Sequence, residues 1–219
     1  MTIQEIKIVL EELSKRRSVF HSEADFQQEL AFAIREKYNK IKIRLEIPFK
    51  IPNDLKNKAL DILLIENEKS KIGIELKYPK AKLKKEFDDE VFSLAMDNNP
   101  GGTRYSFLHD IKRLEELIKQ NKIHKGFVIL LTNDKNIYSD TKFQADKNGE
   151  DRLEHLRLYT KRIIGEKIEI IAFNTTKKSP IPPPKLTKFY LGERGAYKEF
   201  EWIDYCSYNN FKYLLVEVN

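Results

Sequence analysis

The sequence predicts a mixed α/β fold, in which a central mixed β-sheet is flanked by helices. Two amphipathic helical patterns come first, strand patterns follow them, and a third helix precedes two further apolar strands. The 219 residues can bury a substantial core without disulfides or a structural metal. No internal repeat or linker divides the chain, so we expect a single domain over residues 1–219.

The N-terminal elements follow from apolar spacing. The apolar side chains of residues 3–16 recur at helical intervals, which predicts an amphipathic helix. A second helix is predicted after Ser22, a suitable N-cap residue with Asp25 three positions later. The alternating segment 40–52 predicts a strand that ends at its prolines.

The rest of the chain alternates between helical and strand patterns. Helices are predicted in the charged segment 80–97 and at 104–121, with an Asn/Pro/Gly loop at 97–103 between them. Strands are predicted at 126–133, 167–174, 188–193 and 212–218, with a stiff proline-rich connector at 179–185.

Residues 60–80, "LDILLIENEKSKIGIELKYPK", predict two strands joined by a polar turn that carry three charges in apolar runs. Side chains alternate along a strand, so Glu75 and Lys77 lie on one face. If the loop has three residues, 67–69, Asp61 pairs with Glu75 at about 5 Å. A two-residue loop would place the two carboxylates on opposite faces.

These charges predict a site for a divalent cation. Two close carboxylates repel each other unless a cation lies between them, and carboxylate oxygens favour Mg²⁺ or Mn²⁺. Lys77 could hold or deprotonate a water that attacks a phosphate, or neutralise developing charge. The alternative is that the charged residues form salt bridges at solvated strand ends.

Asp61 in "ALDILLI" and Glu75-Leu76-Lys77 in "GIELKY" resemble the motif of the PD-(D/E)xK nuclease superfamily, which has the restriction-endonuclease-like fold. The proline of the motif is replaced here. Glu23, followed by Phe26 and Leu30, is similar to a glutamate that many members carry at the start of the preceding helix.

The resemblance covers a core at residues 22–132, and the segment 179–219 is expected to be an extension of it. "SEADFQQEL" and "GGTRYSFLHDI" also look like stretches of a little-characterised branch of the superfamily. The last third of the chain lies outside the resemblance.

The resemblance implies a mixed sheet flanked by helices, metal-dependent phosphodiester hydrolysis and a DNA substrate. It implies that Asp61, Glu75 and the carbonyl of Leu76 bind Mg²⁺ or Mn²⁺. Lys77 would be the catalytic lysine, and Glu23 would act through metal-bound water. Gln27, one turn after Glu23, would line the same face, although a solvated helix position explains it equally well.

Four basic residues are candidates for contacts with the DNA backbone. Lys80 and Lys82 lie in a lysine-rich segment just after the predicted site, and Arg104 and Lys112 lie in the helix predicted at 104–121. The alternatives are a solvated charged face for the lysines and a helix-start loop around Arg104.

The sequence therefore favours a DNA endonuclease of the restriction, defence or mobile-element type, acting as a homodimer because two strands require two sites. A Holliday-junction or repair nuclease is the first alternative, and RNA stays open as a substrate. A non-catalytic nucleic-acid-binding module and an α/β interaction protein with accidental charges are two further hypotheses.

Composition excludes several classes of protein. The single Cys206 cannot form an internal disulfide, and the four histidines are too scattered for a zinc finger. No apolar run approaches a membrane span and the N-terminus is charged, which predicts a cytoplasmic protein. The net charge of +6 permits a polyanionic partner, but an A+T-rich coding sequence explains it equally well.

Overall fold

The structure is a computed structural model. It describes residues 1–49, 59–87, 89–97, 99–139, 156–161, 168–171, 188–191, 199–206 and 210–219. The helices are α1 (Ile3–Arg16), α2 (Glu23–Lys37), α3 (Pro100–Lys119) and the single turn α4 (Lys135–Tyr138). The strands are β1 (Lys42–Pro48), β2 (Ala59–Asn67), β3 (Ser70–Lys77), β4 (Leu83–Phe87), β5 (Glu90–Leu94), β6 (Lys125–Thr132), β7 (Ile168–Ile171), β8 (Lys188–Leu191), β9 (Trp202–Asp204) and β10 (Lys212–Val218).

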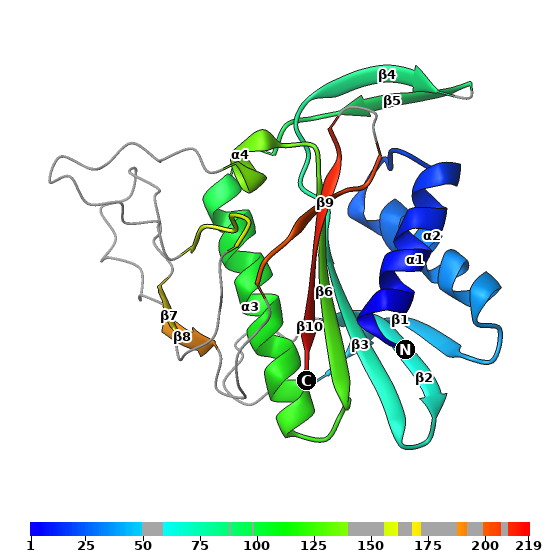
Figure 1. The fold of residues 1–219 in the computed structure, drawn as a ribbon, viewed down its shortest axis with the longest axis vertical. Coiled ribbons are helices and arrows are strands. Elements are labelled where there is room, and N and C mark those ends of the chain that lie inside the picture. Colours follow the sequence, from blue (N-terminus) through cyan, green and yellow to red (C-terminus); the bar gives the residue numbers. More distant parts are fainter. Residues whose placement is uncertain are drawn as a thin grey trace, which may run out of the picture.

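A six-stranded mixed sheet in the order β1-β2-β3-β6-β10-β9 forms the centre of the protein. Among the strands that the structure describes, only β3 and β6 pair in parallel, because α3 provides the crossover between them. Figure 1 shows α1 and α2 on one face of this sheet and α3 on the other. The predicted mixed sheet flanked by helices is confirmed.

Each face of the sheet has its own apolar core. Ile62, Ile74 and Leu76 pack with the buried stripes of α1 and α2. Leu63 and Val128 face the other way and pack against α3. Both faces of the central strands are therefore covered, which explains the nearly continuous apolar runs in their sequences.

The predicted first helix and the Ser22 cap of the second are confirmed, since the Ser22 side chain accepts a hydrogen bond from the Asp25 amide. The strands predicted at 188–193 and 212–218 correspond to β8 and β10, and the segment 167–174 contains β7. The predicted connector at 179–185 lies outside the described residues. None of the helices in the described ranges has the length and hydrophobicity that a membrane span requires.

The prediction of a helix at 80–97 is wrong, because this segment forms the β4–β5 hairpin at one end of the sheet (Figure 1). Phe92 and Leu94 are two residues apart and both are buried, which is strand spacing. Asp89 adopts φ 64° at the turn, a conformation that a helix does not allow. The many charged residues of this segment led to the prediction of a helix, although its buried residues have strand spacing.

The third helix begins four residues before the prediction. The Asn99 side chain accepts a hydrogen bond from the Gly102 amide, and Pro100 occupies the first turn, where it needs no amide partner. The segment 97–103 is therefore only partly a loop. Asn-Pro is a helix-start signal that the two glycines obscured.

Helix α3 packs very closely on the sheet because two strand positions lack side chains. A Cβ atom at Gly126 would lie 2.7 Å from Leu114 Cδ1 and 3.0 Å from Leu114 Cβ. A Cβ atom at Gly73 would lie 3.1 Å from Leu114 Cδ2. The two glycines thus set the distance between α3 and the strands β3 and β6.

We expect Gly126→Ala to lower the free energy of unfolding by about 2 kcal/mol, because the new methyl group overpacks the core against Leu114. Urea unfolding measures this change. Gly101→Ala is the matched control, since nothing lies within 4 Å of its added Cβ atom. The double variant Gly126→Ala/Leu114→Ala should lose less stability than the sum of the losses in the two single variants. Losses that simply add would contradict a contact between the new methyl group and Leu114.

Candidate functional site

The end of β3 is joined to the start of α2 by Tyr78. The Tyr78 hydroxyl donates to the Phe20 carbonyl at 3.0 Å and accepts from the Phe20 amide at 3.1 Å. The Tyr78 amide donates to Glu23 Oε2 at 2.8 Å. The first residue of α2 is therefore fixed beside the last residue of β3, Lys77.

The predicted register of the β2–β3 hairpin is confirmed, since Ile62 pairs with Ile74 and Leu64 with Ile72. The predicted three-residue loop is wrong: Asn67 pairs with Ser70 around the two-residue turn 68–69. The register shift between Ile65 and Asn67 adds one residue to β2. This bulge restores the alignment that a two-residue loop would otherwise have lost.

Asp61 lies where the regular alternation of β2 breaks. Leu60 packs on the α3 side of the sheet, although Ile62 packs on the opposite side. Glu46, the residue of β1 next to Asp61 in the register, has φ 54°. The Asp61 side chain turns toward β3, where Oδ2 accepts from the Leu76 amide at 2.6 Å.

Gln27 lies beside Asp61 and is buried rather than solvated. Its Nε2 donates to the Asp61 carbonyl at 2.7 Å and to Glu46 Oε1 at 2.7 Å. Gln27 therefore holds the irregular part of β2 and β1 in place.

Lys77 points toward α3. Its Nζ lies 2.6 Å from Asp110 Oδ2 and donates to the Leu76 carbonyl at 2.8 Å. Burial works against the ammonium form, but the Asp110 and Glu23 carboxylates outweigh it and raise the pKa of Lys77. The raised pKa favours the ammonium form of Lys77.

Glu75 is almost completely buried, with 1% of its surface exposed. Its Oε1 lies 3.0 Å from Arg113 Nη2, on the same helix as Asp110. Burial, with the nearby Asp110 carboxylate, raises the pKa of Glu75 well above its usual value, although Arg113 opposes this shift.

Glu23, Asp61, Glu75, Lys77, Asp110 and Arg113 together form one charge cluster at this end of β3. Its four carboxylates face two cationic groups, which leaves two excess negative charges when all are ionised. The pKa of Asp61 is raised to about 6, mainly by burial and also by the Glu23 and Asp110 carboxylates. The hydrogen bond from the Leu76 amide and the charge of Lys77 lower this pKa but do not cancel the shift. An oxygen of Asp110 is buried without a hydrogen-bond partner among the described residues.

The donor chemistry of the charge cluster fits a hard divalent cation, because carboxylate and carbonyl oxygens are its preferred ligands and two charges need neutralising. The present arrangement is not a closed metal centre. Within the described ranges, no three Asp, Glu, His or Cys side chains converge as metal ligands would. Lys77 Nζ donates to the Leu76 carbonyl, which the family resemblance implies as a metal ligand.

Comparison with protein-family models, with curated proteins and with solved structures finds no match to this chain.

The predicted nucleic-acid contacts are unequally exposed. Arg104 is 2% exposed and donates to the Asn136 carbonyl, so its side chain is occupied within the protein. Lys112 pairs with Glu116 at 3.1 Å, and Lys80 lies 3.7 Å from Asp97. Lys82, just before β4, is exposed.

Asp110 and Arg113 were not predicted from the sequence. They lie three residues apart, so both side chains reach the same face of α3. A signal was present: Asp110 follows the buried Phe107 by three residues and precedes the buried Leu114 by four. A charged residue inside an apolar helical stripe must be paired, which would have directed attention to the charges of β2 and β3.

Proposed function

We propose that this protein is a metal-dependent nuclease that hydrolyses DNA phosphodiester bonds on a restriction-endonuclease-like fold. The supporting observation is that Asp61, Glu75 and Lys77 meet at the last residues of β3. Asp61 accepts a hydrogen bond from the Leu76 amide, and Lys77 donates one to the Leu76 carbonyl. Glu23 reaches the same segment through the Tyr78 amide.

In this proposal Asp61, Glu75 and the carbonyl of Leu76 hold Mg²⁺ or Mn²⁺. When bound, the metal would polarise the phosphate and neutralise charge on the departing oxygen. Lys77 stabilises negative charge on the phosphate as a permanent cation, since its pKa is raised. Asp110 orients the Lys77 ammonium, and Arg113 favours the ionised form of Glu75 against the effect of its burial.

The proposal includes endonucleolytic cutting in a restriction, defence or mobile-element role, with Holliday-junction or repair cleavage as the alternative. Cutting both strands would require two copies related by a two-fold axis. The setting would be the cytoplasm, where DNA is accessible.

A non-catalytic nucleic-acid-binding module is the second candidate function. The observation in its favour is that Glu75 pairs with Arg113 and Lys77 with Asp110, so that two of the site residues already have protein partners. A cluster with purely structural ion pairs would neither bind a divalent cation nor cut DNA.

We expect wild-type protein to cut supercoiled plasmid or branched DNA only with Mg²⁺ or Mn²⁺, and Lys77→Ala to lower the rate by roughly a hundredfold or more. Gel electrophoresis of time courses measures this rate. Lys42→Ala, on the exposed edge of β1, is the matched control. Glu23→Gln is a second variant, because it removes a charge at an exposed position.

Thermal unfolding with and without Mn²⁺ separates the two functions. Wild-type protein should gain stability with Mn²⁺ by mass action, and Asp61→Asn should not. No cutting together with no stabilisation would reject the nuclease and favour the binding module. Stabilisation without cutting would leave a metal site whose substrate was not supplied.

A further inference from the structure

A lysine-lined recess of about 680 Å³ lies at the other end of the sheet from the charge cluster. It is formed by the β2–β3 turn, the end of α3 and the connection to β6. We name it the lysine recess, and it is lined by Glu68, Lys69, Lys71, Ile118, Lys119, Asn121, Lys122, Ile123 and His124.

The lysine recess concentrates positive charge that the protein does not neutralise. Four lysines against Glu68 give an excess of three positive charges, which is half of the net charge of +6 for the whole chain. Among the described residues none of these four lysines forms an ion pair. Elsewhere, lysines such as Lys7 and Lys125 pair with glutamates.

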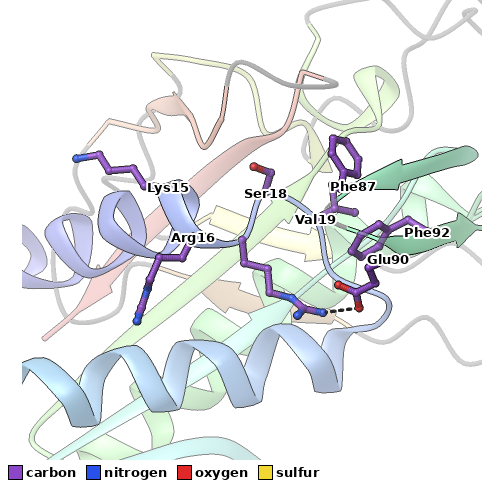
Figure 2. Close-up of a pocket in the computed structure, with 8 residues that line it drawn as sticks. Lys15, Arg16, Ser18, Val19, Phe87, Glu90 and Phe92 are labelled. Atoms are coloured by element: carbon purple, nitrogen blue, oxygen red, sulfur yellow. Dashed lines mark hydrogen bonds and ion pairs between the residues drawn. The ribbon is translucent and has the colours of Figure 1, made fainter.

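A second pocket shows the contrast. The pocket of about 280 Å³ between the end of α1 and the β4–β5 hairpin is also lined by basic residues. Figure 2 shows Lys15 and Arg16 pointing away from Glu90. These two residues pair with glutamates of the helices, and Arg17 pairs with Glu90. This pocket therefore offers no uncompensated charge to an anion.

The lining of the lysine recess also includes two apolar side chains. Ile118 and Ile123 are buried, whereas the lysines extend from exposed or half-buried positions. Cationic side chains with a smaller apolar surface between them complement a ligand that alternates sugar rings with phosphates. This lining complements an acidic peptide less well, because carboxylates on flexible side chains do not present an apolar ring at a fixed interval.

We infer that the lysine recess binds the sugar–phosphate backbone of a nucleic acid. The inference rests on the proposed function for the identity of the polyanion. Lys71 precedes Lys77 by six residues on the same face of β3, so about 20 Å separates the recess from the charge cluster. That length corresponds to about six base pairs of duplex DNA, so a single duplex can reach both.

The test is DNA binding measured by fluorescence anisotropy in EDTA, with a labelled 20-base-pair duplex across a series of salt concentrations. We expect Lys119→Gln/Lys122→Gln to weaken binding about tenfold at low salt and to reduce the slope of log K against log salt by about two. Lys15→Gln/Arg16→Gln removes the same charge from exposed positions on α1, on the opposite face of the sheet from α3, and should change neither quantity by more than about twofold.

Equal weakening in both double variants, or none in either, would overturn the inference. Binding without metal is independent of cleavage, so the two proposals fail separately. Both proposals are supported if Lys77→Ala abolishes metal-dependent cutting and Lys119→Gln/Lys122→Gln weakens DNA binding. If the double variant weakens DNA binding but the wild-type protein never cuts DNA, the lysine recess is supported as a binding site and the nuclease is rejected. The assignment to nucleic acid would also be overturned if Lys119→Gln/Lys122→Gln weakened the binding of a labelled acidic polypeptide as much as the binding of the duplex.

Discussion

Arg113→Met is expected to lower the free energy of unfolding by about 3–5 kcal/mol at pH 8. Arg113 and Glu75 are almost completely buried and lie 3.0 Å apart, so the variant leaves the Glu75 carboxylate without this cation. Methionine keeps most of the side-chain volume, which limits the contribution of lost packing. Urea unfolding at fixed ionic strength measures the change.

The loss should shrink as the pH falls. The pKa of Glu75 is already raised by burial, and removing Arg113 raises it further. A carboxyl group whose pKa is raised in the folded state contributes the most stability while it is protonated. This contribution is lost as the pH rises and the group ionises. The deficit of Arg113→Met should therefore be smaller at pH 5 than at pH 8.

Glu75→Gln/Arg113→Met is the control, because it removes both charges. We expect it to recover at least half of the loss at pH 8. A deficit that is equal at pH 5 and pH 8, with no recovery in the double variant, would show that Arg113 acts by packing alone.

Asp61→Asn is expected to stabilise the protein by about 3 kcal/mol at pH 8 while abolishing metal-dependent cutting. Burial raises the pKa of Asp61 from 3.8 to about 6. Keeping this carboxyl ionised thus costs stability above pH 6, and asparagine removes that cost. The asparagine oxygen can still accept the hydrogen bond from the Leu76 amide.

The sign of the pH dependence tests this explanation. A carboxyl group whose pKa is raised in the folded state contributes stability at a pH below its pKa in the unfolded state. This contribution is lost as the pH rises through its pKa in the folded state. Wild-type protein and Asp61→Asn should therefore differ little at pH 4 and most at pH 8. Glu86→Gln, an exposed control on β4, should show no such divergence. An unstable asparagine variant at pH 8 would refute the cost assigned to Asp61.

Local patterns in the sequence determined the framework of the site. Helical spacing predicted α1 and α2, and the alternating pattern predicted the register of β2 and β3 even though the turn between them was misjudged. The register held because the apolar faces of β2 and β3 must both be buried, and a bulge at Glu66 is a smaller cost than reversing both faces. Capping by Ser22 then placed Glu23 at the end of β3.

Tertiary packing decided the charge state of the site. Asp110 and Arg113 lie more than 30 residues after Lys77 in the chain, and only the crossover that pairs β3 with β6 brings α3 over these strands. Gly73 and Gly126 then let the helix approach closely enough for the two ion pairs. A sequence pattern records spacing within one element, whereas the pKa of a buried group depends on charges from every element packed around it. The sequence therefore located the acidic residues and the lysine, and the packing of α3 brought Asp110 to Lys77 and Arg113 to Glu75.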